Sequence, residues 1–175
     1  MTRQTVIAYW LIPSEPARSF FLRIVNDLAR RYDAPVFEPH VTVYVGADQA
    51  DAAAKALEKV AIECELVRLT PLRIDQSAEF IKTLFVQFAM TAELGKINDI
   101  IRHAANDSSQ YELKPHLSLL YKSLAAATRS ELAASIKVPF SEILFDSLQA
   151  IRCVSPTQTG ADVEAWELMA SRILR

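Results

Sequence analysis

The sequence predicts one domain that mixes helices and strands, built from two copies of the same order of elements. Over about residues 5–75 the pattern reads strand, helix, strand, helix, strand, and the same order returns over about 81–154. Residues 39–43 and 115–119 both read proline, histidine, apolar, hydroxyl, apolar, and their histidines stand 76 positions apart. A duplicated unit explains this spacing, and it would bring the two motifs near a pseudo-twofold axis, facing a shared cleft.

The first copy begins with a strand. Residues 5–13 are rich in β-branched and aromatic side chains, which favour strands. Ser14 as N-cap and an early Pro16 then predict a helix over about 15–32, whose apolar side chains recur at helical spacing. An extended segment leads to the first motif strand, over 40–45. Gly46-Ala47-Asp48 ends that strand and caps a helix over about 49–62.

The second copy follows the same order. A strand-like segment over about 64–75 closes the first copy. A strand over 81–88, a helix over 91–105 and a polar loop over 106–110 open the second. A motif strand over 116–121, a helix near 125–136 and a strand over 143–154 complete it. We also expect a C-terminal strand over about 163–173, although its apolar residues fit neither the helical nor the strand period cleanly.

Composition excludes several classes of protein. The formal net charge of -2 argues against an electrostatic grip on long nucleic acid. The three glycines lie far apart, so neither a P-loop nor a dinucleotide-binding glycine motif can be built from them. Cys64 and Cys153 lack zinc-type spacing and are expected to be free thiols. No stretch reaches transmembrane length, and residues 6–12 suit a strand better than a signal peptide, so we expect a cytoplasmic protein.

The repeated motif carries the chemistry. Side chains two residues apart share one face of a strand, so His40 and Thr42 point the same way, roughly 6.5–7 Å apart. His116 and Ser118 repeat that arrangement. Two imidazoles and two hydroxyls around one small anion suffice for phosphodiester chemistry, because histidine is both a base and an acid near neutral pH and hydroxyls donate to charged oxygens. We therefore take these four residues as the candidate site and expect neither a metal nor another cofactor.

Other aromatic and histidine side chains are less specific. His103 falls on the third predicted helix and is expected on the surface. Tyr121 stands at odd spacing from His116, so it packs in the core unless the strand bends or ends, in which case its ring could stack on a nucleobase or ribose. Trp10 and Phe85, on the strands that open the two copies, are expected to be core aromatics.

These motifs resemble those of the 2H phosphoesterase superfamily. Residues 37–43 (Phe-Glu-Pro-His-Val-Thr-Val) with Gly46-Ala47, residues 9–13 (Tyr-Trp-Leu-Ile-Pro) and residues 115–121 (Pro-His-Leu-Ser-Leu-Leu-Tyr) look like its cyclic phosphodiesterase branch. The resemblance implies a bilobal α+β fold over residues 1–175, with two antiparallel sheets lining a central cleft and helices outside. It also implies acid and base roles for the two histidines, phosphate contacts for Thr42 and Ser118, and a substrate contact for Tyr121.

The resemblance further implies the substrates. Members of this branch open ADP-ribose 1″,2″-cyclic phosphate and nucleoside 2′,3′-cyclic phosphates, the latter to 2′-phosphates. A small cyclic nucleotide is thus the expected partner of a monomer that has no membrane partner. Two alternatives stay open. One is 2′-5′ RNA ligase-like processing of RNA 3′ ends, which would favour a basic groove, and the other is a nucleotide-binding module that has lost turnover. Which histidine is the base also stays open.

Overall fold

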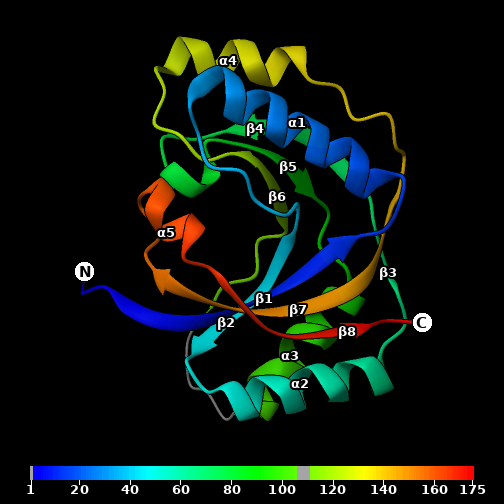
Figure 1. The fold of residues 1–175 in the computed structure, drawn as a ribbon. Coiled ribbons are helices and arrows are strands. Elements are labelled where there is room, and N and C mark those ends of the chain that lie inside the picture. Colours follow the sequence, from blue (N-terminus) through cyan, green and yellow to red (C-terminus); the bar gives the residue numbers. More distant parts are fainter. Residues whose placement is uncertain (1, 106–110) are drawn as a thin grey trace.

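The strands of the protein pair into one antiparallel sheet. A computed structural model describes residues 2–105 and 111–175, so the loop expected at 106–110 lies outside the described residues. Within them, eight strands form a sheet in the order β3-β7-β1-β2-β6-β5-β4, with β8 paired to β7 (Figure 1). The strands are β1 (Gln4–Pro13), β2 (Val41–Ala47), β3 (Val67–Leu69), β4 (Pro71–Gln76), β5 (Leu84–Phe88), β6 (His116–Leu120), β7 (Ile143–Ser155) and β8 (Glu167–Ile173).

Helices cover the two halves of this sheet in pairs. Helices α2 and α3 pack together and against β2, β7 and β8, whereas α1 packs on β6 and α4 packs on β4 and β5. Figure 1 shows α1 and α4 above the strands and α2 and α3 below them. The helices are α1 (Ala17–Tyr32), α2 (Ala50–Glu63), α3 (Ala92–Ala104), α4 (Ala126–Ser135) and α5 (Gly160–Glu164), and one 3-10 turn, η1 (Phe80–Lys82), precedes β5.

Each half of the sheet takes its third strand from the other repeat. One half runs β2-β1-β7 and the other β6-β5-β4, so a motif strand, an opening strand and a third strand follow each other in both. Strand β1 pairs with β2 on one side and β7 on the other, which buries residues 6–12. The matching order agrees with the repeated pattern of the sequence. That residues 1–175 are a single domain that arose by duplication stays a prediction.

The two halves meet at one registered pair of residues. Val41 of β2 pairs with Leu117 of β6, and no other registered pair joins these two described strands. The α+β class is confirmed, and the two antiparallel sheets implied by the resemblance are joined into one at this point. The motifs therefore lie on the seam between the half-sheets.

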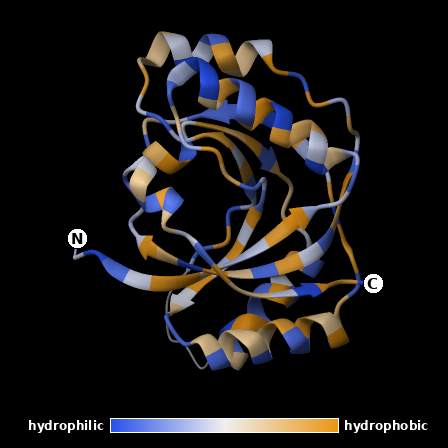
Figure 2. Cartoon of the chain, in the orientation of Figure 1, coloured by the Kyte–Doolittle hydropathy of each residue, from blue (hydrophilic) through white to orange (hydrophobic). Residues whose placement is uncertain are grey.

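Hydropathy explains which faces are buried. Helix α1 turns Phe21, Val25 and Leu28 inward and leaves Arg23 and Arg30 exposed, as the helical period requires. Figure 2 shows mixed hydropathy around the long helices and hydrophobic stretches along the central strands. Among residues 2–105 and 111–175, no helix has both the length and the apolar character needed to span a bilayer.

Two expected helix caps are wrong. Ser14 does not cap α1, because its hydroxyl donates to the Leu144 carbonyl (3.2 Å) and Pro16 occupies the N-cap position. Asp48 does not cap α2, because its carboxylate pairs with Arg152 of β7 (2.9 Å). In both cases a partner from a distant strand, which the local sequence does not reveal, takes the polar group.

Three strand boundaries also differ from the predicted ones. The segment over 64–75 is two strands, β3 and β4, and the segment over 81–88 begins with the turn η1. The segment over 163–173 begins within helix α5 and becomes strand β8 only at Glu167, its fifth position. Thr159 and Asp162 form a capping box that starts α5, which accounts for the mixed period of this segment.

Candidate active site

The pairing of Val41 with Leu117 brings the two motifs onto one face of the sheet. Residues paired across antiparallel strands point to the same side, and their neighbours along each strand point to the other. Val41 and Leu117 are fully buried, so the residues that flank them share the opposite face. The four predicted site residues are therefore together at the seam. They are His40, Thr42, His116 and Ser118.

His40 is held by a carbonyl and by an aromatic ring. Its Nδ1 lies 2.6 Å from the Glu38 carbonyl oxygen, which can only accept, so Nδ1 carries the proton and Nε2 is left for a ligand. The ring stacks on Trp10, with centroids 3.6 Å apart and planes at 10°. Burial lowers the pKa of His40 to about 3, against the opposing effect of the Glu38 carbonyl and with a smaller lowering effect from His116. His40 is thus neutral at physiological pH.

His116 repeats this arrangement in a more open setting. Its Nδ1 lies 2.7 Å from the Lys114 carbonyl oxygen, so Nε2 is again the free nitrogen. Phe85 meets the imidazole edge-on, with centroids 5.5 Å apart. Burial lowers the pKa of His116 and the Lys82 ammonium adds to this, while the Lys114 carbonyl and the Glu79 carboxylate oppose it. Each histidine therefore bonds the carbonyl two residues before it, on the other side of a proline.

The two aromatic partners come from equivalent positions. Trp10 of β1 pairs with Thr42, and Phe85 of β5 pairs with Ser118. Cross-strand partners share a face, so both rings lie on the face that carries the histidines. Trp10 and Phe85 are buried, at 4% and 5% exposed, as expected of core aromatics. Their contacts with His40 and His116 were not predicted. Only the strand register, which the sequence does not state, reveals them.

The two hydroxyls differ in their hydrogen bonds. Ser118 Oγ donates to the Ile81 carbonyl of η1 at 2.8 Å. The Thr42 side chain, in contrast, makes no hydrogen bond to any of the residues that the structure describes. Thr42 can therefore donate to a bound anion directly, whereas Ser118 must first release Ile81.

Tyr121 lies beyond the end of its strand. Strand β6 ends at Leu120, so strand alternation no longer dictates where the Tyr121 ring points. The ring stacks on Phe37, with centroids 3.8 Å apart, and lines the same cavity as His40. Burial raises the pKa of the Tyr121 hydroxyl, so this group stays protonated. The residue lies at the strand end and is also packed in the core, at 3% exposed, in a cluster with Val25 and Val163. Its contact with a substrate stays a prediction.

A cavity of about 190 Å³ lies beside the first motif. The first motif and Tyr121 line it, and the second motif does not. Trp166 packs edge-on against Trp10, with ring centroids 5.0 Å apart. No sequence pattern pointed to this residue, because it lies in a segment of mixed period. The cavity walls are Val6, Ala8, Trp10, His40, Thr42, Val45, Ile81, Tyr121, Cys153, Val154, Ser155, Pro156, Thr157 and Trp166.

Helix α1 connects the segment just before the first motif with the half-sheet that carries the second motif. Arg18 of α1 donates to both carboxylate oxygens of Glu38, at 2.5 and 3.0 Å. Glu38 is the residue whose carbonyl holds His40, while α1 itself packs on β6. The bidentate pair therefore fixes the first motif against the layer that carries the second.

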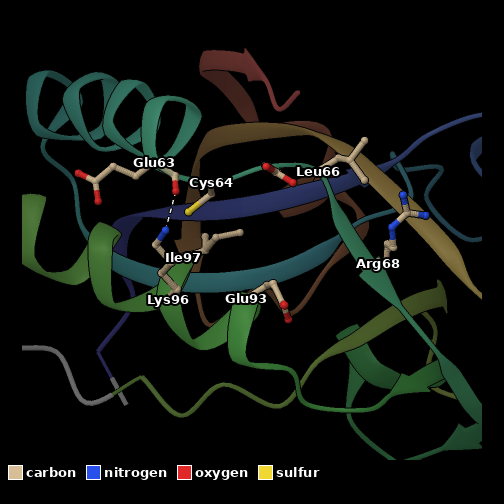
Figure 3. A pocket seen from close by; sticks show the side chains of 8 residues that line it. Glu63, Cys64, Leu66, Arg68, Glu93, Lys96 and Ile97 are labelled. Atoms are coloured by element: carbon tan, nitrogen blue, oxygen red, sulfur yellow. Dashed lines mark hydrogen bonds between the residues drawn. The ribbon is translucent and has the colours of Figure 1, made fainter.

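A larger hollow, of about 420 Å³, lies away from the motifs. It is bounded by the end of α2, the start of β3 and one side of α3 (Figure 3). There Lys96 Nζ donates to the Glu63 carbonyl at 2.5 Å, and Cys64 is a free thiol. His103 is exposed on α3, as predicted, with Nδ1 2.6 Å from the Asp99 carbonyl. None of the predicted site residues lines this hollow, so its size alone does not mark the site.

Comparison with known proteins identifies the family. The family described as "Cyclic phosphodiesterase-like protein" matches residues 5–174. The cyclic phosphodiesterase of Arabidopsis thaliana is 26% identical over 172 residues, which cover 96% of this chain and 94% of that protein. E. coli LigT shares the fold at 13% identity, with a TM-score of 0.58 over 99% of both chains in its apo form. Its complex with 3'-AMP gives 0.55 over 97% of this chain and 98% of that one. The resemblance to 2H phosphoesterases is confirmed, and the chain belongs to the cyclic phosphodiesterase-like family of phosphodiester hydrolases.

Proposed function

We propose that the protein hydrolyses small cyclic phosphodiesters by acid and base catalysis, without a metal. The substrates are ADP-ribose 1″,2″-cyclic phosphate and nucleoside 2′,3′-cyclic phosphates, the latter opened to 2′-phosphates. One observation supports this most directly: two histidines from different strands share one face at the seam, each with Nε2 free. Two such nitrogens can flank one phosphorus, and in-line attack requires a base on one side and an acid on the other.

Ring opening adds one water molecule and breaks one P–O bond. Neutral His40 takes a proton at Nε2 as the water oxygen attacks phosphorus. Protonated His116 gives its Nε2 proton to the ribose oxygen as the P–O bond breaks. The product is a phosphomonoester, and proton exchange with solvent returns both histidines to their starting states. We assign the base to His40 because its burial keeps it neutral, and the acid to His116 because it is more open and lies near the Glu79 carboxylate.

The hydroxyls and Tyr121 are proposed to contact the substrate. Negative charge grows on the non-bridging oxygens during attack, and fixed donors aimed at it lower the barrier. Thr42 is free to donate, and Ser118 gains such a role by rotating away from Ile81. Tyr121 lines the cavity beside His40, where its ring and protonated hydroxyl suit a ribose or a base.

The names of related proteins support a nucleotide as the ligand. The Arabidopsis thaliana relative is a cyclic phosphodiesterase, and E. coli LigT has been solved with 3'-AMP, ATP and NADP+. We expect the protein to act as a monomer, because each motif strand finds its partner within one chain.

The test is a substrate panel followed by phosphorus NMR. The purified protein is incubated in EDTA with ADP-ribose 1″,2″-cyclic phosphate, nucleoside 2′,3′-cyclic phosphates and a short RNA that ends in a 2′,3′-cyclic phosphate. We expect the small rings to open, with the nucleoside products carrying the phosphate on the 2′ oxygen. Activity that disappears in EDTA and returns with a metal would overturn the metal-free mechanism, and no reaction with any of the three would overturn the proposal.

RNA-end processing is the second candidate, because the fold is shared with E. coli LigT. The net charge of -2 weighs against it, since RNA binding is dominated by contacts between basic side chains and phosphates. Turnover of the RNA end alone in the same panel would favour this second function.

A further inference from the structure

Lys82 stands beside the second motif but outside the groups assigned so far. Its ammonium lies over the Phe85 ring, 4.7 Å from the centroid, and Phe85 is the ring that meets His116. The cation and the imidazole therefore share a contact with one phenyl ring. The Lys82 ammonium also acts electrostatically on His116, where it disfavours the protonated imidazole. A cation beside a candidate phosphate site is in a position to bind an anionic group of the substrate.

The backbone of Lys82 is held firmly. Ser77 Oγ donates to the Lys82 carbonyl at 2.7 Å, and the Lys82 amide donates to the Glu79 carbonyl at 3.0 Å. The preceding carbonyl, of Ile81, accepts the bond from Ser118. The base of the side chain is thus fixed relative to the second motif, and only the flexible stem above it can move.

The ammonium of Lys82, in contrast, is not committed to an anion. Lys114 pairs with Glu112 at 2.8 Å, and Lys122 donates to the Asp33 carbonyl at 2.6 Å. Lys82 has neither an ion pair nor a side-chain hydrogen bond within residues 2–105 and 111–175. Its ammonium makes a cation–π contact with Phe85, which is weaker than a charged hydrogen bond to phosphate.

The acidic groups near Lys82 do not neutralise it. The Asp75 carboxylate interacts electrostatically with the Lys82 ammonium, but it is already paired with Arg73 at 3.0 Å. Glu79 is exposed and forms no ion pair with any described residue. A substrate anion that reaches this side of His116 would therefore meet an available cation.

We propose that Lys82 binds a phosphoryl group attached to the 5′ carbon of the ribose that carries the cyclic phosphate. This rests on the proposed function, in which the cyclic phosphate itself lies between the two histidines. Nucleoside 2′,3′-cyclic phosphates have no such second group. ADP-ribose 1″,2″-cyclic phosphate has one, because its pyrophosphate is joined to the 5″ carbon of the same ribose. Lys82 thus sets a preference for substrates with a second, 5′-linked anion.

The test compares two substrates that differ in one group. Adenosine 2′,3′-cyclic phosphate and its 5′-phosphorylated form are assayed with the wild type and with Lys82→Met, which keeps the length of the side chain and removes the charge. We expect Lys82→Met to lower kcat/KM for the 5′-phosphorylated substrate about tenfold, mainly through KM, because one charged hydrogen bond is lost. The 5′-free substrate does not contact this cation and should change less than about threefold. Any effect of the lost charge on His116 acts on both substrates alike, so the ratio of their kcat/KM values isolates the contact with the 5′ group.

Controls separate charge from other effects. Lys82→Arg keeps a cation and should retain most of the preference. Lys55→Met makes the same change of net charge at an exposed position of α2, and should leave both substrates unchanged. ADP-ribose 1″,2″-cyclic phosphate and a dinucleotide with a cyclic end then show whether the second anion that is recognised is a pyrophosphate or the diester of a longer chain.

A binding measurement keeps this test independent of turnover. Calorimetry with adenosine 2′-monophosphate and adenosine 2′,5′-bisphosphate should show tighter binding of the bisphosphate to the wild type, and loss of that difference in Lys82→Met. Equal losses for both substrates, or an unchanged preference in either assay, would overturn the role of Lys82. Absence of turnover together with an intact, Lys82-dependent preference in binding would instead overturn the proposed hydrolysis and leave Lys82 as a ligand-binding residue.

Discussion

His40 and His116 make the same carbonyl contact but differ in their surroundings. His40 is enclosed and stacked on Trp10, whereas His116 is half-buried beside Lys82 and Glu79. Both pKa values lie below the ordinary value of 6.5, that of His40 at about 3. With His40 as base and His116 as acid, the free enzyme should have a bell-shaped pH profile of kcat/KM with both limbs below pH 6.5.

Removing either imidazole is the direct test of the two catalytic roles. His40→Ala and His116→Ala should each lower kcat at least about 100-fold, which is the usual cost of losing one acid or base. Circular dichroism and the thermal midpoint of each variant serve as the control for folding. Near-normal turnover by either folded variant would show that its histidine is not in the mechanism.

Trp10 is expected to keep His40 neutral by excluding water from it. Trp10→Leu admits water, so the pKa of His40 should rise and the acidic limb of the pH profile should move to higher pH. Phe85→Leu is the matched variant in the other half, and it should move the alkaline limb, set by His116, to higher pH. NMR titration of both imidazoles measures these shifts. An acidic limb that stays in place in Trp10→Leu would mean that the stacking has no electrostatic effect.

At the scale of single residues, the local pattern predicted the candidate site residues, and the strand register showed which residues contact them. His40, Thr42, His116 and Ser118 could be proposed because two-residue spacing and repetition are visible in the sequence. Their placement on one face follows from the structure, whereas their chemical roles stay predictions. The contacts of Trp10 and Phe85 depend on which residue stands opposite on a neighbouring strand, and no local pattern contains that relation.

At the scale of elements, the helices were predicted well and the short strands poorly. The bounds of α1, α2, α3 and α4 lie within two residues of the predicted ones, because an apolar stripe extends over several turns. Strand β3 is short and strand β8 is largely exposed, so few of their side chains show the alternation of apolar and polar residues that marks a strand. The helix α5 is five residues long and starts at a capping box, which the sequence shows only once a helix is suspected there.

Ser118 joins strand β6 to the turn η1, and this predicts a difference between the two hydroxyl residues. Ser118→Ala should lower both kcat and the free energy of unfolding, the latter by about 1–3 kcal/mol, because the Ile81 carbonyl loses its donor. Thr42→Val should lower kcat while leaving the free energy of unfolding nearly unchanged. Urea unfolding and initial rates on the same samples measure both. Equal stability of the two variants would mean that the bond from Ser118 to Ile81 contributes nothing to the fold.

At the scale of the whole molecule, the order of the strands in the sheet could not be predicted from the sequence. Hydrophobic periodicity gives the elements but not their neighbours in a sheet. The exchange of β4 and β7 between the half-sheets is a property of long-range pairing. The α+β class and the bilobal expectation came from the resemblance, and comparison with solved relatives confirmed the fold.

Global stability should depend on pH through the buried imidazoles. The unfolded chain binds protons at His40 with a pKa near 6.5, whereas the folded protein does so only near 3, so this contribution is present above pH 6.5 and is lost as the pH falls. The free energy of unfolding should fall by about 2 kcal/mol between pH 7 and pH 5. Urea unfolding at several pH values measures it, and His40→Gln should flatten the curve over this range. An equally steep curve in that variant would assign the dependence to other groups.

The exchange of third strands has a consequence for how the chain is made. The edge of β1 that pairs with β7 stays open until residue 155 has left the ribosome, because β7 is among the last strands to be synthesised. Until then the nascent chain exposes the apolar strand that carries Trp10 and will support His40. The first half-sheet, although encoded first, can therefore be completed only after the second, whose strands end at residue 120, and the cavity beside His40 gains its last walls late in translation.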